Sequence, residues 1–276
     1  MSRIDSHQHF WQFTPERDTW ITHEMSVLRR DFMPEDLEPL LLKYGIEGCV
    51  AVQADQSESE THFLLELANR CDFIKGVVGW IDLRAANVSD RLAYFNRFSK
   101  LKGFRHIVQD EPDTDFLLRP EWLRGIAALQ SYDYTYDILV RAHQLDVTTR
   151  FIEKFPNQRF VIDHLAKPPI GTGDKREWTR AMKGVAQHEN VYCKLSGLIT
   201  EGHLTNWKIS DFDYYINHIL DVFGPNRLLF GSDWPVCLLA GNYGDVLAVI
   251  SRAIAHLSEE QCDRIWRKNA IVCYKL

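Results

Sequence analysis

Two histidines close to the start of the chain are the first residues whose spacing could support chemistry. They stand in the run Asp5-Ser6-His7-Gln8-His9, at the end of a short segment with strand character. Side chains alternate between the two faces of a strand, so His7 and His9 point to the same side. Two imidazoles on one face can bind a metal ion or line a polar reaction pocket. The alternative is two incidental histidines, because a His-x-His pair alone is a weak signal.

Two further motifs place charged groups directly after apolar segments. The first, D-H-L-A-K-P, contains Asp163, His164 and Lys167, and the second, G-S-D-W-P, contains Asp233. An apolar strand that ends in charged groups is unfavourable unless those groups face a wet or functional cavity. The alternatives are a hydrogen-bonded structural histidine at the first motif and a helix-capping aspartate at the second.

Other basic side chains also lie in segments with strand character. Arg105 and His106 are adjacent, so they face opposite sides and at most one of them enters a pocket. Lys194 lies in the segment Val191–Leu195, and we expect a solvated or helix-facing side chain whose ammonium group reaches water. Four histidines in helical stretches receive no functional role: His62, His188, His218 and His256.

The elements that must position these residues alternate between short strands and longer amphipathic helices. Amphipathic stripes predict the helices, for example after the capping pair Ser57 and Glu60. Pro39 interrupts the apolar run Leu37–Leu41, so the first helix is expected to start late. Eight segments are short, rich in Val, Ile and aromatic residues, and bounded by Gly, Pro, Asn or Asp. They are Arg3–His7, Gly48–Gln53, Ile74–Ile81, Gly103–Val108, Tyr134–Val140, Phe160–His164, Val191–Leu195 and Arg227–Phe230.

Strands that alternate with helices form a parallel sheet, because each crossover returns the chain to the same edge. Eight such units in 276 residues fit a closed barrel, which typically takes about 250 residues. No Gly-rich phosphate turn follows the first strand, as an open doubly wound sheet would favour. We therefore predict one α/β domain over residues 1–276, a single (β/α)₈ TIM barrel. Its active site should lie at the C-terminal strand ends, where His7, His9, His164 and Asp233 would meet.

Two long connections are expected to cover that face of the barrel. The segment 10–33 contains Trp11 and Trp20, and the segment 198–210 contains Trp207. Long loops without structure of their own are often functional lids, and indole faces can stack on a sugar ring. The alternative is that these aromatic residues only anchor the loops.

The composition of the chain excludes several classes of partner. Its 38 acidic residues outnumber its 32 Lys and Arg, which gives a formal net charge of −6. This balance argues against nucleic acid, because phosphate binding needs clustered basic side chains. No apolar run approaches the roughly 18 residues of a membrane span, and the first residues lack a secretory apolar core. A cytoplasmic location is therefore the expectation, and the six cysteines should be reduced and mostly buried.

Taken together, the three motifs resemble the amidohydrolase superfamily, which implies that the (β/α)₈ TIM barrel is of the metal-dependent hydrolase type. His-x-His in the first strand, D-H-x-x-K-P after the sixth and G-S-D-W-P after the eighth occur in the order typical of that superfamily, over nearly the whole chain. Within it, the chain is similar to the sugar-lactonase branch, which contains L-fuconolactonases, L-rhamnonolactonases and 2-pyrone-4,6-dicarboxylate hydrolases. The segments 103–106 and 136–137 resemble the fuconolactonase type.

The resemblance implies a carboxylic ester hydrolase that opens a sugar lactone, of the L-fuconolactone type, to its aldonate. It implies that Asp233 is the general base that takes a proton from the attacking water. It further implies that His7, His9 and His164 polarise the lactone carbonyl, directly or through a bound cation.

The resemblance implies that Arg105 and Lys167 hold the oxygens of the substrate and the carboxylate that forms. Trp11, from the first long connection, and His143 are further candidate substrate-binding residues. Attack on an ester carbonyl builds an oxyanion, and donors near the carbonyl oxygen supply most of its stabilisation. The expected partner is then a small-molecule sugar lactone, and the sequence leaves a homo-oligomer open.

The metal is where the sequence departs from binuclear members of the superfamily. Those members use a carboxylated lysine at the end of the fourth strand, where this chain has Arg105, and a histidine on the fifth strand, where this chain has none. A two-metal site is therefore not expected. Two alternatives stay open. Either His7, His9 and Asp233 bind a single divalent cation, for which Zn²⁺ is the leading candidate, or the site works without a metal.

Two other functions compete with the lactonase hypothesis. A metal-dependent decarboxylase of the same superfamily would share the His-x-His pair and the aspartate after the eighth strand. A catalytically silent barrel that binds a sugar acid or a partner protein would keep the aromatic loops. The presence of His7, His9 and Asp233 together argues against the silent barrel.

Overall fold

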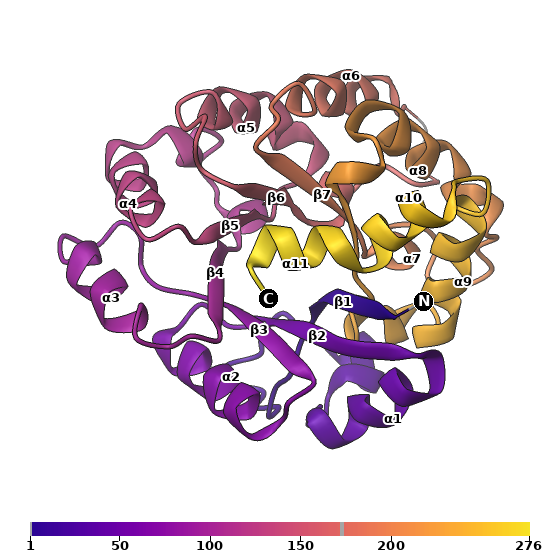
Figure 1. Cartoon of the computed structure of the whole chain (residues 1–276), viewed down its shortest axis with the longest axis horizontal. Coiled ribbons are helices and arrows are strands. Elements are labelled where there is room, and N and C mark those ends of the chain that lie inside the picture. The colour runs from indigo at the N-terminus through magenta and orange to yellow at the C-terminus, as the bar shows by residue number, and fades with distance from the viewer. Residues whose placement is uncertain (1, 172–173) are drawn as a thin grey trace.

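The computed structural model describes residues 2–171 and 174–276, and in it eight parallel strands follow one another in a single sheet, in the order β1 to β8 (Figure 1). The strands are β1 (Arg3–Gln8), β2 (Ile46–Val52), β3 (Ile74–Gly79), β4 (Leu101–His106), β5 (Thr135–Ile138), β6 (Phe160–Ile162), β7 (Val191–Leu195) and β8 (Leu228–Phe230).

The sheet closes between its first and last strands. The His9 N–H donates to the Trp234 carbonyl oxygen, and the Asp233 N–H donates to the His7 carbonyl oxygen, each at 2.8 Å. The backbone of Gln8 pairs in parallel with that of Trp234. The architecture is therefore a (β/α)₈ barrel, which confirms the predicted fold class. Closure also places the backbone of Asp233 directly beside that of His7.

Helices surround the barrel and one of them crosses its end (Figure 1). The helix α11 lies across the N-terminal ends of the strands, where its residues pack with the apolar interior of the barrel. No helix in the described part of the chain is long and apolar enough to cross a membrane. The helices are α1 (Pro34–Tyr44), α2 (Glu58–Arg70), α3 (Val88–Phe95), α4 (Pro120–Gln130), α5 (Leu145–Ile152), α6 (Arg176–Val185), α7 (Leu198–Glu201), α8 (Ser210–Phe223), α9 (Tyr243–Ala253), α10 (Glu259–Asp263) and α11 (Asn269–Tyr274).

The first helix does not start late, so that prediction is wrong. α1 begins at Pro34 and contains Pro39 in its interior. Pro34 occupies the first helical position, where a missing N–H leaves nothing unpaired. Pro39 removes one hydrogen bond within the helix, while Leu37 and Leu41 on the same helix are buried in the core and hold it in place. Gly45, with φ of 67°, ends the helix and leads into β2.

An irregularity in β1 decides which of its side chains enter the barrel. Between Asp5 and Gln8 the register advances three residues on β1 but only two on β2, so β1 contains one extra residue. Ile4 packs with the apolar interior of the barrel, and His7 contacts interior side chains as well. Strict alternation would have put these two side chains on opposite faces.

The sixth strand ends two residues earlier than predicted, because the chain turns into the short segment η5 (Asp163–Ala166). His164, Leu165, Ala166 and Lys167 all have φ between 51° and 54°. Residues other than glycine pay roughly 1–2 kcal/mol each for this left-handed conformation, so the surrounding structure must hold the turn. The Trp178 indole N–H donates to the Leu165 carbonyl oxygen at 2.8 Å and is one such constraint.

Two glycines inside helices should respond in opposite directions to alanine. A Cβ on Gly125 in α4 would lie 1.9 Å from the Leu83 carbonyl oxygen, whereas a Cβ on Gly184 in α6 would meet nothing within 4 Å. We expect Gly125→Ala to lower the free energy of unfolding by about 1–3 kcal/mol, because backbone must move. We expect Gly184→Ala to raise it by about 0.5–1 kcal/mol, because alanine loses less backbone entropy on folding. Urea denaturation measures both, and equal effects in the two variants would contradict the close contact at Leu83.

Candidate active site

A cavity of about 170 Å³ opens at the C-terminal ends of the strands. The structure brings five of the predicted site residues to its wall: His9, Arg105, His164, Lys167 and Asp233. The other lining residues are Trp20, Ala54, Ile107, Gln109, Asp110, Leu139 and Val236. The side chains that the three sequence motifs carry therefore meet at one place, as the barrel hypothesis required.

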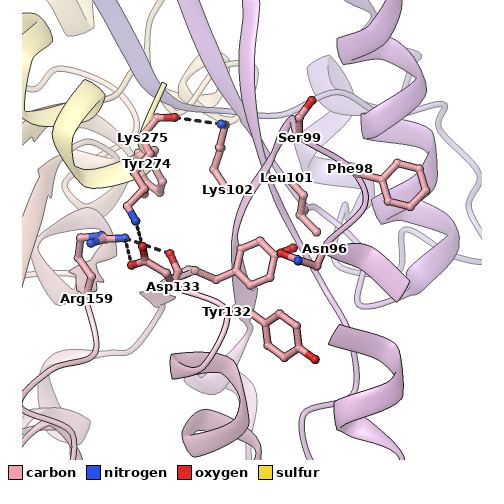
Figure 2. A pocket seen from close by; sticks show the side chains of 11 residues that line it. Asn96, Phe98, Ser99, Leu101, Lys102, Tyr132, Asp133, Arg159, Tyr274 and Lys275 are labelled. Atoms are coloured by element: carbon pink, nitrogen blue, oxygen red, sulfur yellow. Dashed lines mark hydrogen bonds and ion pairs between the residues drawn. The ribbon is translucent and has the colours of Figure 1, made fainter. Parts of the chain in front are cut away.

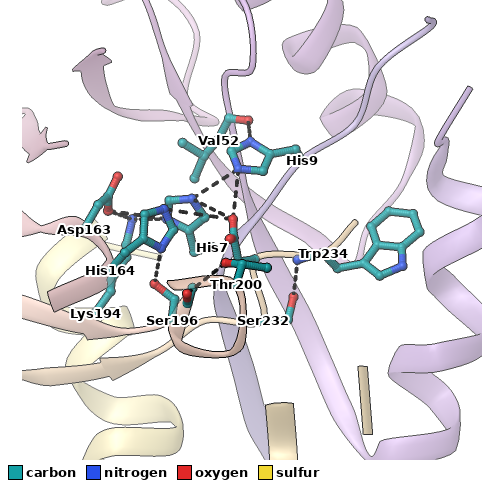
Figure 3. A network of polar contacts seen from close by, with 12 residues as sticks. His7, His9, Val52, Asp163, His164, Lys194, Ser196, Thr200, Ser232 and Trp234 are labelled. Carbon is teal, nitrogen blue, oxygen red and sulfur yellow. Dashed lines mark hydrogen bonds and ion pairs between the residues drawn. The ribbon is translucent and has the colours of Figure 1, made fainter. Parts of the chain in front are cut away.

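Three imidazoles surround the Asp233 carboxylate. Asp233 Oδ1 lies 3.4 Å from His9 Nε2, 3.8 Å from His7 Nε2 and 3.9 Å from His164 Nε2. His7 Nε2 and His9 Nε2 are 3.2 Å apart (Figure 3). The four side chains are at most 7% exposed. Their polar atoms therefore converge in a space from which most water is excluded.

A buried carboxylate connects the first motif to the last. Asp5 Oδ1 accepts the backbone N–H of His7 at 3.1 Å and that of Ser232 at 2.9 Å, and Asp5 Oδ2 accepts the Tyr243 hydroxyl at 2.9 Å. Burial raises the pKa of Asp5 to about 6, against the hydrogen bonds that lower it. Asp5 thus holds together the two chain segments that carry His7 and Asp233.

The hydrogen bonds of His9 and His164 orient their rings. His9 Nδ1 lies 2.7 Å from the Val52 carbonyl oxygen, which can only accept, so the proton of the neutral ring is on Nδ1 and Nε2 offers a lone pair. His164 Nδ1 lies 2.9 Å from Ser196 Oγ. Burial lowers the pKa of His164 to about 4, so this imidazole is neutral at neutral pH.

Behind the imidazoles, Asp163 connects the active site to the barrel interior. Asp163 Oδ2 accepts a hydrogen bond from Arg105 Nη1 at 3.1 Å, and Asp163 Oδ1 lies 3.3 Å from His7 Nδ1. Burial opposes the ionisation of Asp163, but Lys194, His7 and Arg105 outweigh it and hold the pKa of this carboxyl well below its ordinary value. Asp163 is therefore an anion that fixes both a guanidinium and an imidazole of the site.

The expectation that Lys194 reaches water is wrong. Its side chain is fully buried inside the barrel, and its Nζ lies 2.5 Å from Asp137 Oδ2 and 2.9 Å from Asp163 Oδ1. Two carboxylates replace the water that an ammonium group loses on burial. The sequence missed this residue because Val191–Leu195 is an apolar run that shows no partner for a charge.

The prediction for the adjacent pair on β4 is confirmed. Arg105 lines the cavity, whereas His106 points to the opposite side of the sheet. There His106 Nε2 lies 2.7 Å from Glu111 Oε1, and the ring stacks on Phe116 with centroids 5.1 Å apart.

Three of the predicted substrate-binding residues have other surroundings than expected. Lys167 lines the cavity, but its Nζ is already 2.5 Å from Glu201 Oε1 in α7. Trp11 is 1% exposed and its indole N–H donates to the Arg30 carbonyl oxygen at 2.9 Å, away from the cavity wall. His143 is exposed and is not among the lining residues. The structure therefore does not bring Trp11 or His143 to the cavity.

Trp20 stands at the position where Trp11 was expected. The two indoles meet edge to face with centroids 5.7 Å apart, and Trp20 lies on the cavity side, 39% exposed. Both tryptophans are in the same long connection, so their order along the chain does not show which one is outermost. Gln109, Asp110 and Val236 were missed because they belong to no motif. Their one signal is that they lie shortly after a strand end.

The converging atoms also fit a single divalent cation. One ligand atom from each of His7, His164 and Asp233 lies within 4.8 Å of the others, and His9 Nε2 lies within 3.4 Å of Asp233 and of His7. Imidazole nitrogen and carboxylate oxygen are ligands typical of Zn²⁺. The hydrogen bond from His9 to Val52 is of the kind that orients a metal-ligating histidine. The predicted trio of His7, His9 and Asp233 thus converges, with His164 as an additional donor.

Comparison with known proteins places the chain among hydrolases of the same size. The L-fucono-1,5-lactonase of Burkholderia multivorans is 41% identical over an alignment of 290 positions, which covers 99% of this chain and 96% of that protein. The L-fucono-1,5-lactonase of Burkholderia ambifaria is 39% identical over 262 residues, which cover 95% of this chain and 88% of that protein.

A crystal structure of an amidohydrolase from Burkholderia multivorans with bound zinc superimposes with a TM-score of 0.97, at 40% identity and with 100% of both chains covered. The amidohydrolase profile matches residues 4–276. The motifs, the barrel and these similarities agree, and the chain belongs to the amidohydrolase family.

Proposed function

We propose that this amidohydrolase hydrolyses a sugar lactone of the L-fucono-1,5-lactone type to the open aldonate. The observation that carries the proposal is the buried Asp233 carboxylate, which faces His7, His9 and His164 at one cavity of the barrel. The two relatives with about 40% identity, both named L-fucono-1,5-lactonases, support the substrate class.

Asp233 is suited to take a proton from the attacking water. Burial by itself would raise its pKa, but His164, His9 and His7 outweigh burial and hold this pKa below its ordinary value. Asp233 is therefore ionised at physiological pH. A positioned general base contributes roughly 10²–10⁴-fold to the rate, and the same carboxyl can return the proton to the ring oxygen that leaves the carbonyl.

The remaining lining residues favour a sugar lactone with one polar edge and one apolar face. Arg105 and Lys167 bring positive charge to the wall of the cavity, where it stabilises the oxyanion that forms at the carbonyl. Trp20, Ile107 and Leu139 provide apolar surface for the sugar ring. Pockets that combine few polar groups with apolar walls are typical of small-molecule sites.

We also propose that the site binds one divalent cation, for which Zn²⁺ is the leading candidate. The ligands would be His7, His9 and Asp233, with His164 as an additional ligand. When bound, such a cation supplies Lewis-acid polarisation of the carbonyl oxygen. Arg105 Nη1 lies 3.3 Å from His7 Nε2, and this neighbouring positive charge weakens the affinity of the site for a cation.

The direct test is hydrolysis of a panel of five- and six-membered aldonolactones, followed with a pH indicator. We expect the wild-type protein to open L-fucono-1,5-lactone faster than buffer does. Asp233→Asn keeps the size of the side chain but cannot take a proton, so kcat should fall by about 10²–10⁴-fold. Asp146→Asn, which removes an exposed carboxylate on α5, is the matched control and should keep full activity.

Two results would contradict this proposal. An unchanged kcat in Asp233→Asn would show that another group activates water. If the panel gives no hydrolysis but aromatic acids release CO₂, the protein is a decarboxylase instead.

The pH dependence follows from the shifted groups. At pH values above its pKa of about 4, His164 is neutral, and Asp233 keeps its negative charge over the same pH range. We expect kcat/KM to stay level from pH 8 to pH 6 and to fall as the pH decreases through about 4.

The unfolded chain binds more protons than the folded one between the ordinary histidine pKa of about 6.5 and this lowered value, so stability also decreases on acidification. Near-UV circular dichroism separates the two effects. A fall in kcat/KM centred near pH 6.5, with the fold intact, would contradict a neutral His164.

Zinc binding can be measured independently of activity. In equilibrium dialysis with Zn²⁺, chelator-treated wild-type protein should take up one ion per chain. His9→Gln removes a ligand, which should weaken binding by at least about tenfold. His256→Gln, an exposed histidine outside the cavity, is the control and should match the wild type. Equal uptake by wild type and His9→Gln would reject the proposed ligand set.

A further inference from the structure

We propose that Lys194 is a positioning residue of the active site. Its ammonium group, supported from behind by Tyr274, holds Asp163 in the orientation that fixes His7 and Arg105. The activity readout of this inference rests on the proposed lactonase function, while its spectroscopic readout does not.

Four side chains form a continuous buried chain from the bottom of the barrel to the active site. The Tyr274 hydroxyl donates to the Asp137 carboxylate, at 2.9 Å from Oδ1 and 2.8 Å from Oδ2. Asp137 Oδ2 lies 2.5 Å from Lys194 Nζ, and Lys194 Nζ lies 2.9 Å from Asp163 Oδ1. All four residues are at most 1% exposed. We call this series, Tyr274-Asp137-Lys194-Asp163, the buried charge chain.

The upper end of the buried charge chain meets His7 on the side opposite to Asp233. Lys194 Nζ lies 3.1 Å and Asp163 Oδ1 lies 3.3 Å from His7 Nδ1 (Figure 3). His7 Nε2 then faces Asp233 at 3.8 Å. Because a ring held at one nitrogen cannot turn freely, these two contacts set the direction in which the other nitrogen points.

The same carboxylate also positions Arg105, whose Nη1 donates to Asp163 Oδ2 at 3.1 Å. Asp163 therefore has a cation on each side, Arg105 at Oδ2 and Lys194 at Oδ1. Without Lys194, one of these attractions is lost and the neighbouring Asp137 carboxyl is left without its cation. In a low-dielectric interior such an imbalance has large effects, and the carboxylate would move toward Arg105 and away from His7.

Stability alone does not account for charges at this level of the barrel. The surrounding interior is apolar and includes Val50, Val161 and Leu229. Hydrophobic residues of similar volume often replace a buried ion pair with equal or greater stability. Lys194 and Asp137 differ from their apolar neighbours in that they lead to Asp163 and His7, which points to a role in the active site.

The lower end of the buried charge chain is anchored by the C-terminal segment. Lys102 Nζ donates to the Lys275 carbonyl oxygen at 2.9 Å, and the Lys275 ammonium group pairs with Asp133 (Figure 2). Arg159 Nη2 lies 3.0 Å from Oδ1 of the same Asp133. These contacts hold the end of α11 against the barrel, with the Tyr274 side chain directed inward to Asp137.

The central test compares Lys194→Met with the double variant Asp137→Asn/Lys194→Met. The single variant leaves Asp137 unpaired and should lose both thermal stability and activity. The double variant removes one positive and one negative charge, so we expect Tm to recover toward the wild-type value. Because Asp163 and His7 still lack Lys194, kcat on L-fucono-1,5-lactone should stay about 10–100-fold below wild type, with a smaller change in KM. Recovery of kcat together with Tm would show that Lys194 only stabilises the fold and would overturn the proposal.

A second pair of variants tests the contribution of Tyr274. Tyr274→Phe removes the hydroxyl that donates to Asp137. Thr135→Val is the matched control, because Thr135 Oγ1 donates to the Cys273 carbonyl oxygen at 2.7 Å and so joins the same strand to the same helix outside the buried charge chain. We expect Tyr274→Phe to lower kcat by up to about tenfold and Thr135→Val to leave it unchanged. Equal losses of kcat would assign the effect to the docking of α11 and would overturn the part assigned to Tyr274.

The spectroscopic readout uses protein labelled with ¹⁵N at its 11 histidines, with the His7 signal assigned by its loss in His7→Gln. The His7 imidazole resonances should shift in the double variant and stay in place in Thr135→Val. An unshifted His7 signal in the double variant would overturn the proposal. If the wild-type protein opens no lactone, the proposed function fails, and the shift still decides whether Lys194 positions His7.

Discussion

The low-dielectric interior of the barrel requires a partner for every carboxylate buried there, and three aspartates meet this requirement in different ways. Asp5 accepts from neutral donors, among them two backbone N–H groups and a tyrosine hydroxyl, and burial raises its pKa to about 6. Asp163 has Arg105 and Lys194, which keep it an anion. Asp233 lies beside histidine imidazoles and lines the cavity. The same residue type thus has three roles that depend on its partners: Asp5 connects two strands, Asp163 orients active-site side chains, and Asp233 borders the cavity.

The same site concentrates unfavourable backbone conformations at the ends of the strands. His164 to Lys167 and Asp233 all have positive φ without being glycine. These conformations turn the chain sharply after β6 and β8, which brings His164 and Asp233 toward each other above the barrel. Such strain persists only where packing and hydrogen bonds hold it. The full burial of Leu165 and Ala166 and the hydrogen bond from Trp178 provide that support for the first turn.

The amino-acid sequence was sufficient to predict the barrel and the convergence of His7, His9, His164 and Asp233. Both predictions rest on local patterns, namely apolar runs in the strands and polar residues at the strand ends. It was not sufficient where the outcome depends on contacts distant in the chain. The extra residue in β1 shows only in its register against β2, more than 40 positions away, and the burial of Lys194 depends on Asp137, 57 positions away. The choice of Trp20 over Trp11 as the exposed indole likewise depends on how the long loop packs against Phe32.

The pairing of the cations around the cavity also bears on turnover in the proposed reaction. Arg105 is paired with Asp163 and Lys167 with Glu201 before any substrate arrives. Because both cations already have carboxylate partners, a neutral lactone can enter without stripping water from an unpaired charge. The oxyanion that develops on the lactone is then stabilised by these two cations, which remain paired with their carboxylates. The aldonate product carries a full negative charge beside Asp233 and has to compete with Asp163 and Glu201 for the same cations. The arrangement thus stabilises the charge of the transition state, while its own carboxylates disfavour retention of the product anion.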